Sequence, residues 1–353
     1  MMRRILIGTF AVLAALVLLM VAFRGPLSLR LMHRFMVRNL STDYIAALPD
    51  GLHVALCGAG SPLPDPKRSG PCVAVVAGHS LFVVDAGSGG ARNLALMHLP
   101  PGRIQAVFLT HFHSDHINGL GAMALARWAG AGHHSPLPVR GPTGVGEVVG
   151  GFNLAYTQDA VYRVRHHGAE TMPPSGAGMQ AQPFPTPTVG HELVVWDQDH
   201  VKVTAFRVDH APVSPAVGYR FDYGGRSAVI SGDTKRNDEV QRMATGADLL
   251  VHEALSRRLV GVIHEAALEA GNRRMAKITN DIQSYHTTPV EAAEIAQAAH
   301  VGQLLYDHIV PPLVLPGMQA VFLDGVADAY SGPVTVGVDG TWIDLPARAG
   351  QNR

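Results

Sequence analysis

Cysteine, excess charge and aromatic side chains are all scarce in this chain of 353 residues. The two cysteines, Cys57 and Cys72, do not form a Cys-x-x-Cys pair, which excludes a zinc ribbon. Lys and Arg together number 28, as do Asp and Glu, so no overall charge draws the chain toward nucleic acid. No repeat of solenoid length is present, which excludes a repeat array. A chain that is 47% hydrophobic can still bury a sizeable core in one large domain or two ordinary ones.

The two cysteines lie in segments that we expect to be neighbouring strands. A disulfide between Cys57 and Cys72 could form if the domain folds in an oxidising compartment. Two buried free thiols are the alternative, and the sequence does not decide between them.

A long hydrophobic run occupies the N-terminus, where residues 5–23 follow Arg3 and Arg4. As a helix this run would rise about 28 Å, close to the thickness of the hydrocarbon layer of a bilayer. The residues before Arg24 lack the small side chains of a signal-peptide cleavage site. We therefore predict an uncleaved transmembrane helix, a signal anchor, in residues 1–24.

Basic side chains continue after the predicted anchor. Arg30, Arg34 and Arg38 are spaced four apart, with Leu31 and Phe35 on another side of the same helix. This pattern predicts a basic amphipathic juxtamembrane segment in residues 25–50 that lies on anionic headgroups, and a solvated linker helix is the alternative. We expect a globular domain in residues 51–346 and a flexible tail in residues 347–353.

Residues 106–121, which read AVFLTHFHSDHINGLG, combine a short buried strand with a dense cluster of metal-binding side chains. Neutral imidazoles and carboxylates together suit zinc. Alternate side chains of an extended segment point the same way, so His111 and His113 can share one ion. The turn into the following helix sets Asp115 and His116 aside for a second ion.

Further side chains of the same kind recur at the ends of predicted strands, namely Asp85, His210, Asp233, His252 and His286. Strand-rich halves with helices between them predict two layers of sheet covered by helices. One site at an edge of this sandwich would collect the strand-end residues. Asp85 could hold a ligand histidine by its second nitrogen, although capping a turn is an equal alternative. Residues 168–200 contain no Lys or Arg and are rich in Pro and Gly, which predicts a long irregular loop.

These motifs resemble the metallo-β-lactamase superfamily over about residues 52–345. The HxHxDH motif is His111, His113, Asp115 and His116, and Asp85 matches the first motif of the family. The segments VDHAPVSPAVGYRFDY, AVISGDTKR and SYHTTPVEAAEIAQ are similar to the ribonuclease Z and arylsulfatase-like branch. The GHTPG-like motif of lactonases and glyoxalase II-type enzymes is absent. The resemblance implies an α/β fold, an αββα sandwich of two mixed β-sheets flanked by helices.

The resemblance also implies a dinuclear zinc site. His111, His113 and His210 would hold one ion and Asp115, His116 and His286 the other, with Asp233 bridging the two. Manganese or iron remains an alternative to zinc. Asp115 would orient a metal-bound hydroxide that acts as the nucleophile, and His252, backed by Glu253, would give a proton to the leaving group. The alternative for His252 is a structural histidine, and we assign no role to His308.

Three functions fit this site. We rank first a membrane-tethered, arylsulfatase-like hydrolase of small anionic sulfate or phosphate esters, in a bacterial-type inner membrane with a single pass and a periplasmic or extracellular catalytic domain. The alternative is a ribonuclease Z-like endoribonuclease that processes the 3′ end of tRNA. Such enzymes hold tRNA with a basic arm, and the loop at 168–200 has no cation, so nucleic acid ranks lower as a partner. A non-catalytic metal-binding domain ranks third, because the expected ligand set is complete. A homodimer is possible.

Overall fold

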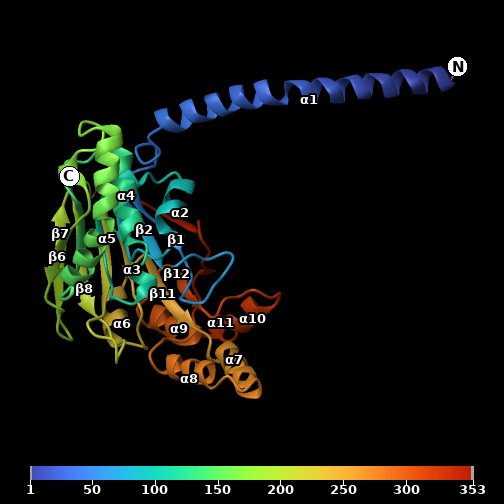
Figure 1. Ribbon diagram of the computed structural model, residues 1–353. Helices are drawn as coiled ribbons and strands as arrows, with labels where there is room; N and C mark the ends of the chain where they lie inside the picture. Colours follow the sequence, from blue (N-terminus) through green and yellow to red (C-terminus); the bar gives the residue numbers. More distant parts are fainter. Residues whose placement is uncertain (1, 351–353) are drawn as a thin grey trace. The chain divides into compact units, whose positions relative to one another are not determined.

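The computed structural model describes residues 2–350, and it describes the side chains of residues 10, 20, 21 and 23–350. The chain divides into two compact units, Met1–Ala47 and Leu48–Arg353. The second unit carries all of the strands described below, and Figure 1 shows its two sheets and the helices that cover them.

The first unit is dominated by helix α1 (Met2–Ser41), which contains Pro26. Across the part of the chain that is described, no helix is both long enough and apolar enough to cross a bilayer. Most side chains of the predicted anchor lie outside the described residues. The predicted transmembrane helix is thus not found in the described part of the chain, and the inner-membrane location that depended on it is contradicted.

The described part of the second unit contains two seven-stranded mixed sheets. In each sheet the strands on one side pair in parallel and those on the other side pair antiparallel. The first sheet has the order β14 (Trp342–Pro346), β1 (Gly51–Gly58), β2 (Cys72–Ala77), β3 (Ser80–Val84), β4 (Ile104–Phe108), β5 (Leu137–Pro142) and β6 (Met179–Phe184). The second has the order β13 (Val334–Val336), β12 (Leu304–Val310), β11 (Leu249–Leu255), β10 (Arg226–Ile230), β9 (Val217–Tyr223), β8 (Val201–Arg207) and β7 (Glu192–Gln198).

The main hydrophobic core lies between the two sheets. The ring of Phe108 in the first sheet packs edge-on against Tyr219 and Phe221 in the second, with ring centroids 5.4 and 5.7 Å apart. Strands β1 and β2 are buried along their whole length, as expected for strands covered on both faces. These two sheets confirm the predicted α/β class and the two-sheet architecture.

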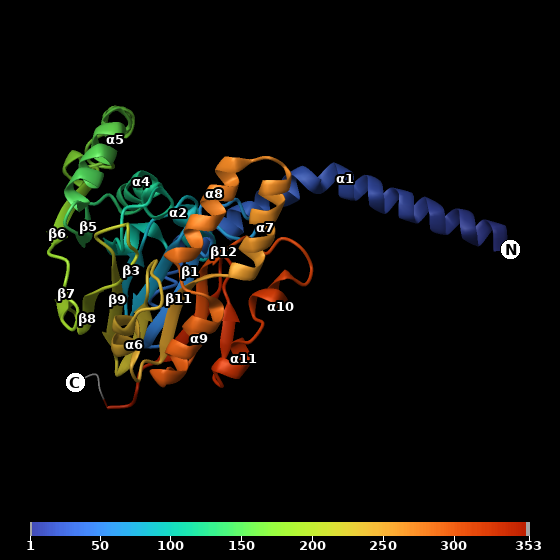
Figure 2. The same cartoon turned by 90° about the horizontal axis from the view of Figure 1, so that it is seen from below.

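Helices cover the outer faces of both sheets (Figures 1 and 2). A second core joins α6, α9, α10 and α11 to the outer face of the second sheet, and α2 and α4 pack on the first sheet. The helices after α1 are α2 (Gly90–Leu96), η1 (Pro101–Arg103), α3 (Ser114–Ile117), α4 (Leu120–Ala131), α5 (Val145–His167), η2 (Pro174–Gly176), α6 (Asp238–Ala244), α7 (Arg257–Glu269), α8 (Arg273–Asp281), η3 (Ile282–Ser284), α9 (Pro289–Ala298), α10 (Met318–Phe322) and α11 (Val326–Ala329).

The segment predicted as an irregular loop, residues 168–200, instead contains strands β6 and β7. Each is the outermost strand of its sheet, and β6 includes Pro183. Edge strands tolerate proline because one side of the strand has no partner. The composition therefore indicated an edge position, which we misread as absence of regular structure. Of the predicted tail, Ala347 and Arg348 donate backbone hydrogen bonds to Asp50 and Gly224, and residues 351–353 lie outside the described residues.

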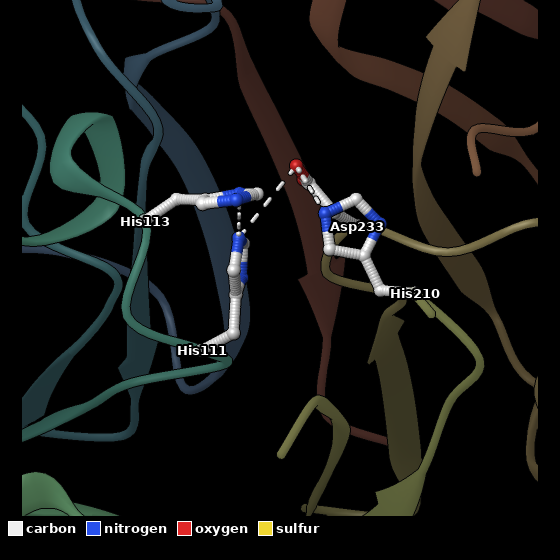
Figure 3. Close-up of side chains that lie close together, drawn as sticks. All are labelled: His111, His113, His210 and Asp233. Atoms are coloured by element: carbon white, nitrogen blue, oxygen red, sulfur yellow. Dashed lines mark hydrogen bonds and ion pairs between the residues drawn. The ribbon is translucent and has the colours of Figure 1, made fainter. Parts of the chain in front are cut away.

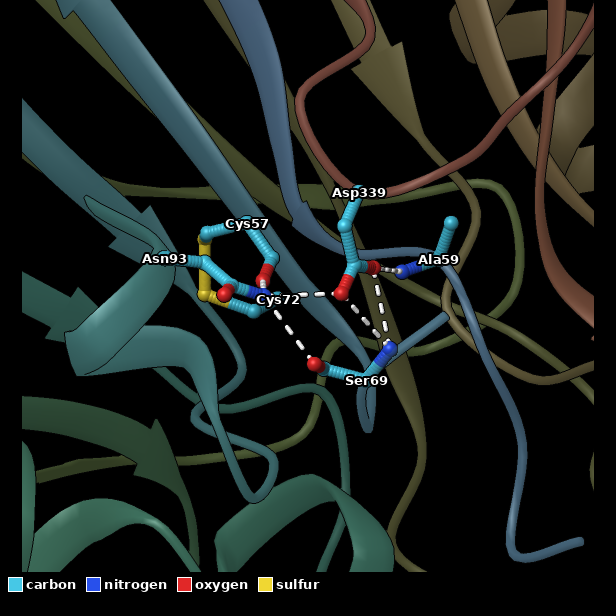
Figure 4. The surroundings of a disulfide bond; sticks show 6 residues. All are labelled: Cys57, Ala59, Ser69, Cys72, Asn93 and Asp339. Carbon is cyan, nitrogen blue, oxygen red and sulfur yellow. Dashed lines mark hydrogen bonds between the residues drawn. A yellow bond between two sulfur atoms is a disulfide. The ribbon is translucent and has the colours of Figure 1, made fainter. Parts of the chain in front are cut away.

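A disulfide joins Cys57 at the end of β1 to Cys72 at the start of β2, which resolves the choice that the sequence left open (Figure 4). It closes the loop that connects the two strands. Asp339 holds the same loop from inside, because its carboxylate accepts hydrogen bonds from the backbone N–H groups of Ala59 and Ser69 and from the side chain of Asn93. The loop is thus fixed near both of its ends, by the disulfide and by Asp339.

Replacing both cysteines, as Cys57→Ala and Cys72→Ala, should lower the free energy of unfolding by about 3 kcal/mol, the contribution expected for a closed loop of about 15 residues. Denaturant unfolding of the variant and of the oxidised parent would measure the difference. The parent treated with a reductant serves as the control and should match the variant. An unchanged unfolding midpoint would show that the covalent link does not constrain the unfolded chain.

Candidate metal centre

Metal-binding side chains gather at one edge of the sandwich, beyond the C-terminal ends of strands from both sheets. The first sheet contributes Asp85 after β3 and the segment 110–116 after β4. The second sheet contributes His210 after β8, Asp233 after β10 and His308 within the last residues of β12. Parallel strands end at the same edge of a sheet, which brings residues far apart in sequence to one place.

The first group of ligand atoms comes from His111, His113, His210 and Asp233, whose side chains converge in Figure 3. Nε2 of His111 lies 2.9 Å from Nδ1 of His113. Oδ2 of Asp233 lies 3.8 Å from Nε2 of His111 and 3.8 Å from Nε2 of His210. Three imidazoles and a carboxylate in this arrangement form a set that suits a divalent transition ion.

The second group consists of Asp115, His116 and His308. Oδ2 of Asp115 lies 3.6 Å from Nε2 of His116 and 3.3 Å from Nε2 of His308. Oδ2 of Asp233 lies 3.4 Å from each of the same two nitrogens. Asp233 therefore stands between the two groups and can contribute to both.

Several polar atoms at this edge are buried and make no hydrogen bond, among them Nε2 of His116, Nε2 of His210 and Oδ1 of Asp233. A buried polar atom without a partner is costly, so such atoms in one cluster indicate a ligand that they hold together. Their chemistry, imidazole nitrogen and carboxylate oxygen, fits a divalent metal ion.

The ionisation of these side chains is consistent with a metal centre. Burial lowers the pKa of His210 to about 4 and places that of His111 well below its usual range, so both imidazoles are neutral at pH 7 as ligands must be. Burial opposes protonation of His308 as well, but the carboxylates of Asp233 and Asp115 raise its pKa to about 9. The second group therefore has an excess of negative charge, which a divalent cation would balance by displacing the proton.

Other residues orient the ligands. Asp85, in the left-handed conformation with φ of 58°, accepts a hydrogen bond of 2.8 Å from Nδ1 of His116. It also accepts the N–H and the hydroxyl of Thr110, each at 2.8 Å, and Thr110 lies 3.0 Å from Nδ1 of His111. Nδ1 of His210 lies 2.9 Å from the carbonyl oxygen of Tyr285. In this way Nε2 of all three histidines is directed toward the ligand clusters, and Asp85 has the contacts that the predicted orienting role requires.

Two cavities open at this centre, and both are lined by Asp115. One, of about 190 Å³, is enclosed by α7 and α8 and also reaches Asp233 and His286. The other, of about 670 Å³, is more open and runs along the loop from Ser61 to Gly70. An apolar cavity of about 570 Å³ between α4 and α5 is lined by none of the clustered ligands. Substrate access to the centre is therefore through the first two.

The sequence profile described as the metallo-beta-lactamase superfamily matches residues 65–272. The chain belongs to this superfamily. Ribonuclease Z from Mycobacterium bovis (strain BCG / Pasteur 1173P2) is 36% identical over 293 residues, which are 82% of this chain and 96% of that relative.

Solved structures of the superfamily share the fold. The metallo-β-lactamase fold protein YhfI from Bacillus subtilis superposes with a TM-score of 0.59 at 18% identity, over 84% of this chain and 100% of YhfI. The short form of human tRNase Z gives a TM-score of 0.57 at 21% identity, over 83% of this chain and 99% of the human protein. The predicted family and branch are thereby confirmed, as is a metal-dependent hydrolase that acts on ester bonds.

The first-ranked function, however, is wrong. The relatives that match almost the whole catalytic domain are named ribonuclease Z, which contradicts a membrane-tethered, arylsulfatase-like hydrolase. These relatives give no support to a small anionic ester or a lipid bilayer as a partner. They favour nucleic acid, which we ranked lower. The error came from treating one cation-free segment, residues 168–200, as the whole of the surface that could contact RNA.

The structure brings together nearly all of the predicted metallo-β-lactamase ligands, but it adds His308 to them. This histidine is buried on β12, and its ring stacks on those of His116 and His286 at centroid distances of 5.2 and 5.5 Å. A signal for it was present in the sequence, because His308 lies near the end of a segment that reads as a strand, residues 304–310, and the other ligands follow such segments. His286, predicted as a ligand, also reaches Asp233 and His308 in a third group, but its Nδ1 faces Glu253 at 3.2 Å.

His252 is not brought to the centre. Side chains of a strand alternate between its two faces, and on β11 the neighbours Leu250 and Ala254 belong to the core beneath the helices. His252 shares their face and is fully buried there, whereas Glu253 points the other way, toward His286. The predicted proton transfer from His252 therefore has no geometric support. Glu253 supports His286 rather than His252.

The substitution Asp85→Asn should weaken metal binding about 10- to 100-fold, the usual cost of removing an orienting partner of a ligand histidine. The amide keeps the volume but loses the charge and part of the capacity to accept three hydrogen bonds. Competition with a chelator measures the affinity. Asp344→Asn is the matched control, because Asp344 also bonds a histidine, His53 at 2.6 Å, but on β14 and outside both ligand clusters. Equal affinity in both variants would refute the orienting role.

Proposed function

We propose that this protein is a ribonuclease Z-like endoribonuclease that uses two zinc ions to remove the 3′ extension of precursor tRNA. The observation that carries the proposal is the 36% identity to ribonuclease Z over 96% of that enzyme. The ligand clusters and the two cavities beside them support a hydrolytic centre, and the same superfamily supplies the fold.

The residues divide between two ions. His111, His113 and His210 would hold one, Asp115, His116 and His308 the other, and Asp233 would bridge them. A set this rich in nitrogen favours zinc over magnesium or calcium. When bound, the two ions would supply Lewis-acid stabilisation of the phosphoryl oxygens and lower the pKa of an attacking water. Asp115 lines both cavities, so its carboxylate can orient that water toward phosphorus.

Proton delivery is assigned to His286 with Glu253. Oε1 of Glu253 accepts the N–H of Thr287 at 2.8 Å, and its Oε2 lies 3.2 Å from Nδ1 of His286. Burial raises the pKa of Glu253 and lowers that of His286 to about 4, which favours a protonated carboxyl group beside a neutral imidazole. His286 lines the enclosed cavity, where Nε2 can give a proton to the leaving oxygen while Nδ1 takes one from Glu253.

Cations that can contact RNA phosphates lie outside residues 168–200. Helix α5 ends with Arg165, His166 and His167, and α8 begins with the exposed Arg273 and Arg274. Phosphate contacts need local cations rather than a basic chain overall. This distribution is compatible with a chain of zero net charge that binds tRNA.

The full chain, loaded with zinc, should cleave a precursor tRNA at the base of its 3′ extension and leave mature tRNA intact. The products would be resolved by gel electrophoresis, with a chelator-treated sample as the control. Failure to cleave precursor tRNA under conditions in which the same sample hydrolyses an aryl phosphodiester would overturn the proposal while confirming that the centre is active.

A further inference from the structure

The enclosed cavity at the metal centre has a floor and walls of different chemistry. Its floor consists of His113, Asp115, Asp233, His286 and His308. Its walls are apolar and come mainly from the hairpin formed by α7 and α8, which contributes Val260, Ile263, Met275 and Ile278. Leu63 and Ile282, which lie outside the two helices, complete the walls. A group that enters it therefore places a polar end at the clustered ligands and an apolar body against the hairpin.

The dimensions of the cavity limit that body to one ring system. Its volume of about 190 Å³ is below the range of about 300–1,000 Å³ typical of sites for drug-sized ligands. Tyr285 adds an aromatic ring, which is held edge-on against His210 with centroids 5.0 Å apart. Aromatic and apolar side chains bind single nucleobases by stacking, and the thioether of Met275 makes favourable contacts with ring systems.

The hairpin is a separate structural unit that is fixed over the cavity. Nδ1 of His264 on α7 lies 2.9 Å from the carbonyl oxygen of Ala276 and 3.1 Å from the hydroxyl of Thr279, which ties the two helices together. A small cluster of Leu255, Val260 and Val310, distinct from the two main cores, holds the hairpin on the domain. The wall thus has a defined shape while two of its residues, Met275 and Ile278, remain 36% and 48% exposed at the mouth.

We propose that the α7–α8 hairpin forms a subsite for a single unstacked nucleobase, that of the nucleotide which carries the leaving oxygen. This inference rests on the proposed RNA cleavage and adds the part of the substrate that is recognised. We assign the subsite to the nucleotide that carries the leaving oxygen because His286, the proposed proton donor to that oxygen, lines this cavity. The base must leave the helical stack to enter, because the cavity has no room for a base pair. The hairpin therefore selects a substrate whose scissile linkage adjoins an unpaired nucleotide.

Two exposed wall residues and two exposed residues elsewhere on the same hairpin provide a matched test. The variant Met275→Ser with Ile278→Ser alters the wall. The control, Val262→Ser with Leu268→Ser, alters apolar residues that are 62% and 56% exposed and do not line the cavity. All four positions are partly exposed, so folding should survive both pairs of changes. Metal content should remain that of the parent in both variants.

Each protein would be assayed on two precursor tRNAs, one intact and one that lacks only the base of the leaving nucleotide. For the parent and the control, kcat/KM should fall about 5- to 150-fold on the abasic RNA, the range expected for one stacked base. The wall variant should lose activity on intact RNA and show little further loss on abasic RNA. If removal of the base lowers kcat/KM by a similar factor in the wall variant and in the parent, the subsite is overturned while the proposed RNA cleavage stands. No cleavage of intact RNA by the parent would overturn both proposals.

Discussion

The substitution Asp233→Asn should lower kcat/KM by at least about a thousandfold and remove most of the bound metal. Asp233 is buried, and one of its oxygens lies within 3.8 Å of nitrogens on His111, His116, His210 and His308. An amide keeps the shape of the side chain but removes the charge that bridges both groups. Metal ions supply several kcal/mol of transition-state stabilisation, and each 1.36 kcal/mol is about tenfold in rate.

The matched control for this variant is Asp222→Asn. Asp222 lies in the same sheet but pairs with Ser227 at the start of β10, whereas Asp233 follows the end of that strand. The control should retain both metal and activity, as measured by elemental analysis and by steady-state hydrolysis of an aryl phosphodiester. A metal-loaded Asp233→Asn protein with the rate of the control would show that no bridging carboxylate is needed.

Substitution of His286 and of His308 should have different consequences. The variant His308→Ala should lose about one of two metal ions, because its nitrogen belongs to the second ligand group. The variant His286→Ala should keep both ions and lose about 10²- to 10⁴-fold in kcat, the usual contribution of a general acid. A proton donor matters most when the leaving oxygen is basic, so the loss should be large with RNA and small with a nitrophenyl ester.

Elemental analysis of the two variants distinguishes the alternatives for the second metal. If His286→Ala loses an ion and His308→Ala does not, His286 and not His308 holds the second ion, as was expected from the sequence. An equal loss of rate on RNA and on the nitrophenyl ester would exclude His286 as the proton donor. The parent protein, measured on both substrates, provides the reference ratio.

The sequence was most informative where ligands are adjacent. The spacing of His111, His113, Asp115 and His116 is set by the extended segment after β4 and one turn of helix, so local geometry alone predicts that they converge. Local spacing cannot tell whether His286 or His308 belongs to the second ligand group. The answer depends on how β11 and β12 align across a register shift beside Glu253, which no spacing in the sequence reveals.

The assignment of His252 failed for a related reason. Adjacent residues of a strand face opposite ways, so His252 and Glu253 cannot both point to one site. Only the packing of Leu250 and Ala254 under the helices shows which of the two faces the centre. The prediction for residues 168–200 failed because proline and glycine content measures local preference, whereas pairing with β5 and β8 is decided by the tertiary structure.

The ligand groups take side chains from both sheets of the sandwich, with His111 and His116 on one and His210, Asp233 and His308 on the other. An ion held by both sheets binds the native chain and has no equivalent site in the unfolded one, so its binding free energy adds to the stability of the whole domain. At a free metal concentration of 100 times Kd this gain is about 2.7 kcal/mol. The resistance of this enzyme to unfolding and proteolysis should therefore vary with the supply of metal around it, and a metal-starved cell would lose the protein as well as its activity.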